Sequence, residues 1–86
     1  MSTELRLLAV QAARRGAAVC LQHWGEAVDI ATKSAAGDVV TAVDRAAEEA
    51  VRSVLLTARP DDGVLGEELA EHVGTGTVQW VVDPLD

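Results

Sequence analysis

An apolar stripe with helical spacing in the middle of the 86-residue chain constrains its fold more than any other feature. The stripe consists of Val43, Ala46, Ala47, Ala50, Val51, Val54, Leu55 and Ala58. Most charged residues of the segment are expected on the opposite side: Asp44, Arg45, Glu48, Glu49 and Arg52. Recurrence at three- and four-residue steps predicts a helix over residues 42–59. Thr41 and Asp44 match the two ends of a capping box, so the helix is expected to start there.

A similar stripe at the start of the chain predicts a first helix over residues 4–24. Gly16 lies on this stripe and costs about 1 kcal/mol of helix stability relative to Ala. We therefore expect Gly16 to permit the close approach of another element. Between the two helices, residues 27–33 and 38–41 are predicted to form two short strands joined by a loop at residues 35–38.

Two short apolar runs follow the second predicted helix, and each ends in acidic residues. Val64-Leu65-Gly66 precedes Glu67-Glu68, and Trp80-Val81-Val82 precedes Asp83. Apolar runs of this length are typical of buried strands. The predicted class is therefore α/β (α+β), in the order helix, two short strands, helix and two further strands. Residues 1–86 are expected to form one small domain or a piece of a larger one.

Composition and charge restrict the location and the partners of the chain. The single Cys20 excludes an internal disulfide and favours a reducing compartment. No apolar run reaches the roughly 20 residues of a membrane span, and the N-terminus lacks the pattern of a signal peptide. A net charge of −7 argues against a nucleic-acid partner. We therefore expect a cytoplasmic protein that binds neither nucleic acid nor membrane.

Four acidic residues lie at the ends of predicted elements: Asp44, Glu67, Asp83 and Asp86. If the last two strands are neighbours, the carboxylates that follow them meet at one edge of the sheet. The carbonyl of Leu85 could join Asp83 and Asp86, and three hard oxygens suit Mg²⁺ or Ca²⁺. A shared cation would relieve the repulsion between these carboxylates.

Each of these features also has a plainer interpretation. Asp83 followed by a proline at a strand end is an ordinary turn, and Glu67-Glu68 alone could be a solvated acidic pair. Asp44 could be only a capping residue, although that role is compatible with a role in a site. Lys33 could be a surface lysine. The spacing of the acidic residues by itself does not decide between these interpretations.

Three segments together resemble the inositol monophosphatase family. Residues 33–44, Lys-Ser-Ala-Ala-Gly-Asp-Val-Val-Thr-Ala-Val-Asp, are similar to the first block of that family. Residues 65–68, Leu-Gly-Glu-Glu, are similar to its Gly-Glu-Glu block. Residues 80–86, Trp-Val-Val-Asp-Pro-Leu-Asp, are similar to the start of its Asp-Pro-hydrophobic-Asp-Gly-Thr signature. The chain stops before the Gly-Thr of that signature, so we expect it to be the N-terminal portion of an enzyme and inactive alone.

The resemblance implies a Mg²⁺-dependent phosphomonoesterase with a layered α/β/α/β/α fold, usually a homodimer. It implies that Glu67, Asp83 and Asp86 bind metal through carboxylates and Leu85 through its carbonyl, and that the same four residues lie against the substrate phosphate. Asp44 would help to hold the attacking water. Asp44 and Glu67 are therefore the expected catalytic residues, the first through this water and the second through the metal and the phosphate. Lys33 and Thr41 lie in the first block, with less certain roles.

The expected reaction is hydrolysis of inositol monophosphate to inositol and phosphate, and the substrate is a small phosphorylated polyol or sugar. Histidinol-phosphate, fructose-1,6-bisphosphate and nucleotide 3′-phosphate phosphatases share the metal signature and are the main alternatives. A non-catalytic Mg²⁺- or Ca²⁺-binding module and a small helical interaction domain remain as non-enzyme alternatives. Metal binding by the isolated chain would favour the module, and partner binding that is indifferent to chelators would favour the interaction domain.

Overall fold

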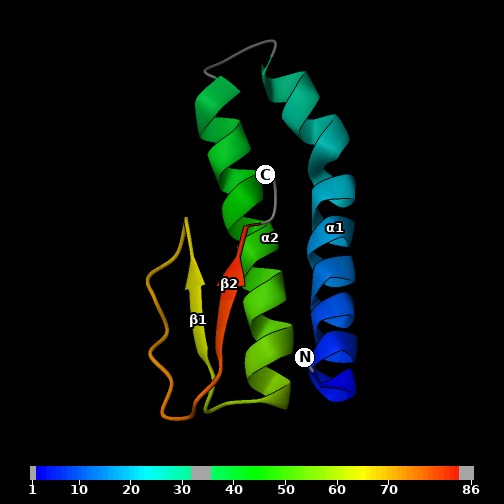
Figure 1. Cartoon of the computed structure of the whole chain (residues 1–86). Helices are drawn as coiled ribbons and strands as arrows, with labels where there is room; N and C mark the ends of the chain where they lie inside the picture. The colour runs from blue at the N-terminus through cyan, green and yellow to red at the C-terminus, as the bar shows by residue number, and fades with distance from the viewer. Residues whose placement is uncertain (1, 32–35, 84–86) are drawn as a thin grey trace.

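The computed structural model describes residues 2–31 and 36–83, with side chains for residues 2–23 and 42–83. Its elements, in chain order, are α1 (Thr3–Ala31), α2 (Ala36–Ala58), β1 (Gly63–Gly66) and β2 (Gln79–Val82). The two helices run antiparallel beside each other, and the strands lie against one side of the pair (Figure 1). This arrangement confirms the predicted mixed α/β class, and it is compatible with the N-terminal part of the fold that the resemblance implies.

Both helices are longer than predicted, and they replace the two short strands expected between them. Residues 27–31 belong to α1 and residues 36–41 to α2, so the strand predictions at 27–33 and 38–41 are wrong where the structure describes the backbone. Residues 32–35 lie outside the described part. β-Propensity spans only about 1 kcal/mol, whereas adding residues to an existing helix avoids the cost of nucleation. The helices therefore extend through β-prone residues.

The earlier start of α2 also corrects the expected helix cap. Because α2 begins at Ala36, Thr41 and Asp44 lie inside the helix rather than at its N-terminal end. The loop predicted at residues 35–38 is wrong from Ala36 onward for the same reason. At the start of α1 a cap is present, since the Leu5 amide donates to Ser2 Oγ over 3.1 Å.

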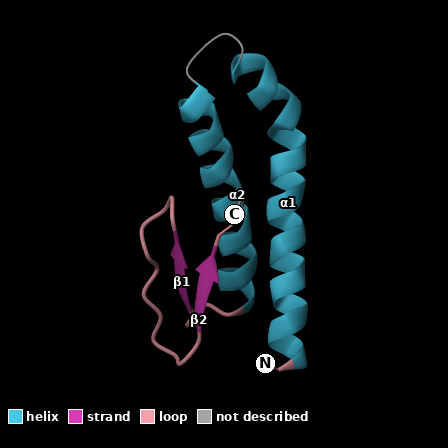
Figure 2. Ribbon diagram, turned by 45° about the horizontal axis from the view of Figure 1, so that its top comes forward, coloured by secondary structure: helices cyan, strands magenta, loops and turns pink. Residues whose placement is uncertain are grey.

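The two predicted final strands are present and pair in parallel. Their register places Gly63 opposite Gln79 and Gly66 opposite Val82. The connection between them contains no helix, and the backbone of His72 pairs with Val64 in a short antiparallel bridge on β1. Figure 2 shows both strands on the same side of the helix pair, with the connecting loop farther from α1. Parallel pairing brings the carboxyl ends of β1 and β2 to the same edge of the sheet.

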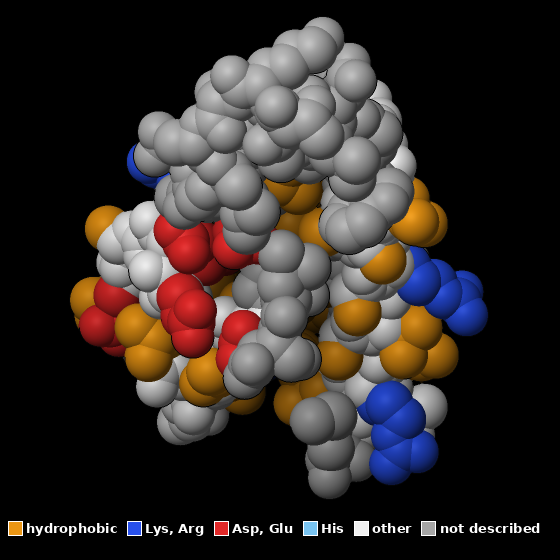
Figure 3. Space-filling view, turned by 90° about the horizontal axis from the view of Figure 1, so that it is seen from above, with side chains coloured by type: hydrophobic (Ala, Val, Ile, Leu, Met, Phe, Trp, Pro, Cys, Tyr) orange, Lys and Arg blue, Asp and Glu red, His pale blue; other side chains and the backbone are white. Residues whose placement is uncertain are grey.

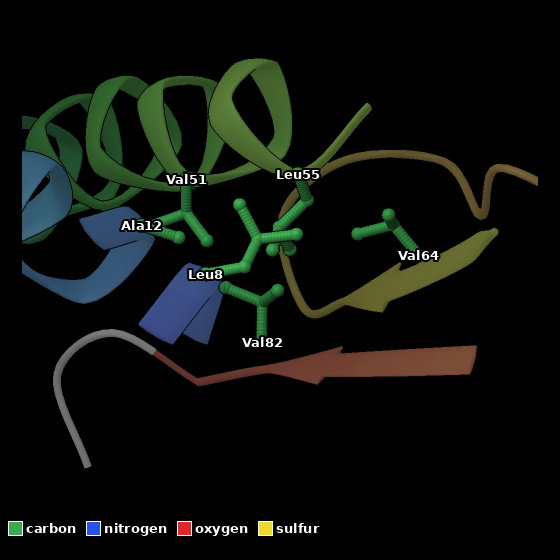
Figure 4. Close-up of a cluster of buried hydrophobic side chains, with 6 residues drawn as sticks. All are labelled: Leu8, Ala12, Val51, Leu55, Val64 and Val82. Atoms are coloured by element: carbon green, nitrogen blue, oxygen red, sulfur yellow. The ribbon is translucent and has the colours of Figure 1, made fainter. Parts of the chain in front are cut away.

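The hydrophobic core lies where the sheet meets the groove between the helices. Its buried side chains come from all four elements: Leu8, Ala12, Val51, Leu55, Val64 and Val82 (Figure 4). Trp80 packs against this cluster from β2. The core thus joins the strands to the helices, so the position of the strand ends depends on helix packing.

The predicted close approach at Gly16 is confirmed. Gly16 is buried between α1 and α2, and a Cβ atom placed there would lie 2.6 Å from Val51 Cγ2. That separation is too short for two carbon atoms, so a larger residue would push the helices apart. Gly16 therefore sets the distance between α1 and α2 beside the core.

Asp62 connects the end of α2 to β2. Its Oδ2 atom accepts hydrogen bonds from Arg59 Nε and, over 2.9 Å, from Trp80 Nε1. These bonds, that from Arg59 above all, lower the pKa of the Asp62 carboxyl below its ordinary value. The almost fully buried carboxylate therefore holds the turn after α2 against the strand that leads to Asp83.

Candidate functional site

The register of the sheet places two of the predicted site residues at equivalent positions. Gly66 pairs with Val82, and Glu67 and Asp83 are the first residues after β1 and β2. Both side chains are exposed. The condition on which the sequence argument depended, that the two strands are neighbours, is confirmed. The roles of Glu67 and Asp83 as metal ligands stay predictions.

Four other predicted residues cannot be placed in the site. Lys33, Leu85 and Asp86 lie outside the described residues, and Thr41 lies in α2 but its side chain is not described. Within residues 2–23 and 42–83, no three His, Cys, Asp or Glu side chains form a group that could hold a metal ion. The described carboxylates are therefore only a part of the predicted ligand set.

Asp44 lies inside α2, and one of its carboxylate oxygens is buried. In the described part of the structure Oδ1 has no hydrogen-bond partner, although the residue as a whole is half-buried. Loss of solvent around the group raises the pKa of the Asp44 carboxyl above its ordinary value. A buried oxygen without a partner is costly, and a water, an ion or a ligand group could supply the missing hydrogen bond or charge.

Glu48, one helical turn after Asp44, is the residue that the sequence argument missed. It was expected on the solvent side of the helix, but its side chain is fully buried. Oε1 accepts the amide of Glu68 over 3.0 Å, and Oε2 accepts the amide of Leu69 over 2.9 Å. Arg52 Nη2 lies 3.6 Å from Oε2 and compensates the charge.

A signal for this burial was present in the sequence. Glu48 precedes Val51 by three residues and Leu55 by seven, so it shares their helical face. The position was assigned to the solvent side because charged residues are rarely buried. Glu48 has the spacing of the apolar stripe and precedes Arg52 by four residues. This combination could have identified it as a buried, charge-compensated carboxylate.

Acidic side chains gather on the face that contains the strand ends. Figure 3 looks along the strands from above and shows Asp and Glu side chains together on this face, beside residues that are not described. The register puts Glu67 and Asp83 at the ends of the two strands, and Asp44 lies four residues before Glu48, which contacts the segment after β1. Carboxylate oxygens are the ligands that hard divalent cations prefer.

A separate cleft lies between α1 and β2. Its lining is mostly small and apolar: Ala9, Ala12, Ala13, Gly16, Ala17, Val51, Leu55, Trp80, Val81, Val82 and Asp83. Asp83 is the only charged residue among the described residues that line it. The cleft thus offers a single carboxylate, whereas several carboxylates lie at the strand ends, where a divalent cation could share them.

None of the helices in the described ranges combines the length and the apolar character that a membrane crossing requires.

Comparison with known proteins gives a consistent picture. The model of the inositol monophosphatase family matches residues 1–86. The Nus factor SuhB of Salmonella typhimurium strain LT2 is 40% identical over 82 residues, which is 92% of this chain and 30% of the relative. An inositol-1-monophosphatase of Caulobacter vibrioides is 40% identical over 79 residues, covering 90% of this chain and 31% of the relative.

A third relative, a histidinol-phosphatase of Chlorobaculum parvum, is 33% identical over 86 residues, which is all of this chain and 33% of the relative. The chain thus spans about a third of the length of these curated relatives. No solved structure matches it. Because the family model matches every residue of the chain, the chain belongs to the inositol monophosphatase family.

Proposed function

We propose that the chain is the N-terminal part of a Mg²⁺-dependent phosphomonoesterase that hydrolyses inositol monophosphate. Membership of a phosphatase family supports the reaction class, and the Caulobacter relative named inositol-1-monophosphatase supports the substrate. The observation that carries the proposal is the parallel register, which sets Glu67 and Asp83 at the same end of adjacent strands. Both residues are exposed, so their carboxylates could bind a divalent ion that in turn binds the phosphate.

The chemistry of the described residues fits a hard divalent cation. Glu67 and Asp83 offer carboxylate oxygens, and Asp44 Oδ1 is buried without a partner in the described part. In this proposal Glu67, Asp83 and Asp86 hold the metal through carboxylates, and Leu85 does so through its carbonyl. When bound, the ion would neutralise phosphate charge, acidify water and stabilise the leaving oxygen.

The residues of the chain then have distinct tasks. In this proposal Glu67 and Asp83, which follow paired positions of the two strands, hold the ion that binds the phosphate. Asp44 Oδ1 accepts a hydrogen bond from the water that attacks phosphorus, and the raised pKa of this carboxyl makes it a better proton acceptor. As the new P–O bond forms, the bond from phosphorus to the alcohol oxygen breaks in line with it, and the released alkoxide takes up a proton from solvent to leave as the alcohol.

Histidinol phosphate is the second candidate substrate, because the Chlorobaculum relative named histidinol-phosphatase matches the whole chain. Both substrates are phosphate monoesters of small alcohols, so the same carboxylates would serve either reaction. The proposal also includes a cytoplasmic location and, for the complete domain, a homodimer.

The test uses the full product of the reading frame that contains this chain. With Mg²⁺ it should hydrolyse inositol 1-phosphate with a higher kcat/KM than histidinol phosphate, and EDTA should abolish the activity until Mg²⁺ is restored. A higher kcat/KM for histidinol phosphate would favour the second candidate. No hydrolysis of either monoester would contradict the proposal. The isolated 86-residue chain should show no turnover, and turnover by it would refute its expected inactivity.

A further inference from the structure

A buried carboxylate outside the proposed ligand set holds the segment that follows β1. Glu48 is fully buried, and each of its two carboxylate oxygens accepts one backbone amide, from Glu68 and from Leu69. These partners are 20 and 21 residues away in the sequence, so the contact joins α2 to the turn after the strand. Hydrogen bonds to a charged acceptor are stronger than those between neutral groups.

Gly66, the residue before Glu67 in the chain, lies against the same carboxylate. A side chain at Gly66 would overlap the Glu48 carboxylate, so only glycine allows the strand end to lie this close to α2. Both neighbours of Glu67 in the chain are therefore fixed against Glu48. Gly66 contacts the carboxylate by close packing, and Glu68 contacts it through a hydrogen bond.

The negative charge of Glu48 is compensated by groups of the protein itself. Two amides and Arg52 surround its carboxylate, and the side chain has no exposed surface. A buried carboxylate needs such compensation, because the loss of hydration costs several kcal/mol. Glu48 therefore does not act as a ligand, whereas Glu67, which lies between its two contacts, is exposed.

We propose that Glu48 is a positioning residue, which fixes the backbone on both sides of Glu67 and so presents the Glu67 carboxylate to the divalent ion. This inference rests on the proposed function, because it takes Glu67 as a metal ligand. It assigns to α2 a second task beside that of Asp44. Residues that orient metal ligands typically change metal affinity 10- to 100-fold when they are replaced.

The first measurement is Mg²⁺ affinity by calorimetry, with Mg²⁺ alone and the full product of the reading frame. Glu48→Gln keeps the shape of the side chain but replaces one acceptor oxygen with an amide that cannot accept a hydrogen bond. We expect at least about a tenfold loss of Mg²⁺ affinity. Glu49→Gln is the matched control, because Glu49 is exposed on the same helix and loses the same charge. Equal affinities in a folded Glu48→Gln protein and the control would overturn the proposal.

The second measurement needs no metal and separates this proposal from the proposed function. Amide hydrogen exchange should be slow at Glu68 and Leu69 in the unmodified protein and much faster in Glu48→Gln, while core amides such as that of Leu55 stay protected. Unchanged protection at Glu68 and Leu69 would overturn the positioning role. If the unmodified protein binds no Mg²⁺, the proposed function fails, and the exchange data still decide whether Glu48 holds the turn.

A second variant covers the case in which Glu48→Gln does not fold. Gly66→Ala displaces the carboxylate without changing any charge, and no positive φ angle opposes the substitution. It should reproduce the tenfold loss of Mg²⁺ affinity and the faster exchange at Glu68 and Leu69. Because both variants break one contact, the loss in the double variant should be smaller than the product of the two single losses. Normal Mg²⁺ affinity in Gly66→Ala would contradict the proposal.

Discussion

Two successive turns of α2 carry buried carboxylate oxygens that are treated in opposite ways. Glu48 is fully buried, and both of its oxygens accept amides. Asp44 is only half-buried, but its Oδ1 atom has no partner among the described residues. The comparison teaches that burial alone does not define a functional carboxylate. The satisfied group stabilises the fold, and the unsatisfied one is the group that a water or substrate can complete.

The largest expected effect comes from removing the satisfied carboxylate. Glu48→Ala should lower the free energy of unfolding by about 3–5 kcal/mol, because it leaves two amides and the Arg52 charge without a buried partner. Urea unfolding followed by circular dichroism measures the change. Glu49→Ala on the exposed face should change the stability by less than about 0.5 kcal/mol. A loss for Glu48→Ala no larger than that of this control would contradict the assignment.

Removing the unsatisfied carboxylate should have the opposite effect on stability and a large effect on catalysis. Asp44→Asn should raise the urea midpoint slightly, since a neutral amide is less costly to desolvate than a carboxylate. In the full product of the reading frame, kcat should fall about a hundredfold, because the proposed proton acceptor for the attacking water is lost. If Asp44→Asn lowers the stability and leaves kcat unchanged, Asp44 stabilises the fold and the contrast with Glu48 is wrong.

A smaller effect is expected at the cation beside Glu48. Arg52→Met removes the charge that lies 3.6 Å from Glu48 Oε2, but the two amide hydrogen bonds remain. Arg52 Nε and Nη2 are themselves buried without hydrogen-bond partners in the described part, so their removal also relieves a cost. The free energy of unfolding should therefore fall by clearly less than in Glu48→Ala. A loss as large as that of Glu48→Ala would show that charge compensation, rather than the amides, holds the carboxylate.

The smallest expected effect is in the pH dependence of stability. The pKa of Asp44 is raised in the folded protein, so its charged form costs stability at neutral pH, and this cost disappears as the pH falls toward 3.8. The pKa of Asp62 is lowered, so its contribution is complete above 3.8 and is lost as the pH falls through the folded value. Asp44→Asn should therefore flatten the profile above pH 3.8, and Asp62→Asn should flatten it below.

Thermal unfolding measured at a series of pH values separates these two contributions. The sign is the decisive feature, because the two carboxyls respond to acid in opposite directions. Profiles that change in the same pH range for both variants would contradict the assigned pKa directions.

The sequence predicted the fold best where patterns were long or sharply bounded. The stripe on α2 identified a helix, and the apolar runs before Glu67 and Asp83 identified both strands of the sheet. The prediction was wrong between the helices. The β-branched residues there favour strands by local propensity, but they lie next to two helices that extend through them. Local propensity is weaker than the extension of an existing helix.

For the candidate site, the sequence identified the exposed Glu67 and Asp83 but not the buried Glu48, which accepts the amides of the two residues after Glu67. Glu67 and Asp83 follow apolar runs, so their place at strand ends was evident from the sequence. The role of Glu48 depends on contacts 20 and 21 residues away, which no local pattern specifies. Buried polar networks of this kind become visible only when the tertiary structure brings their partners together.

The bridge between Val64 and His72 has a consequence for the growth of the sheet. The amide of each residue donates to the carbonyl of the other, over 2.9 and 2.8 Å, while the opposite edge of β1 is paired with β2. At Val64, the edge of β1 that faces away from β2 is therefore already hydrogen-bonded to the protein's own backbone. A neighbouring polypeptide would find no open template for strand addition at that point, which is a known safeguard against edge-to-edge aggregation.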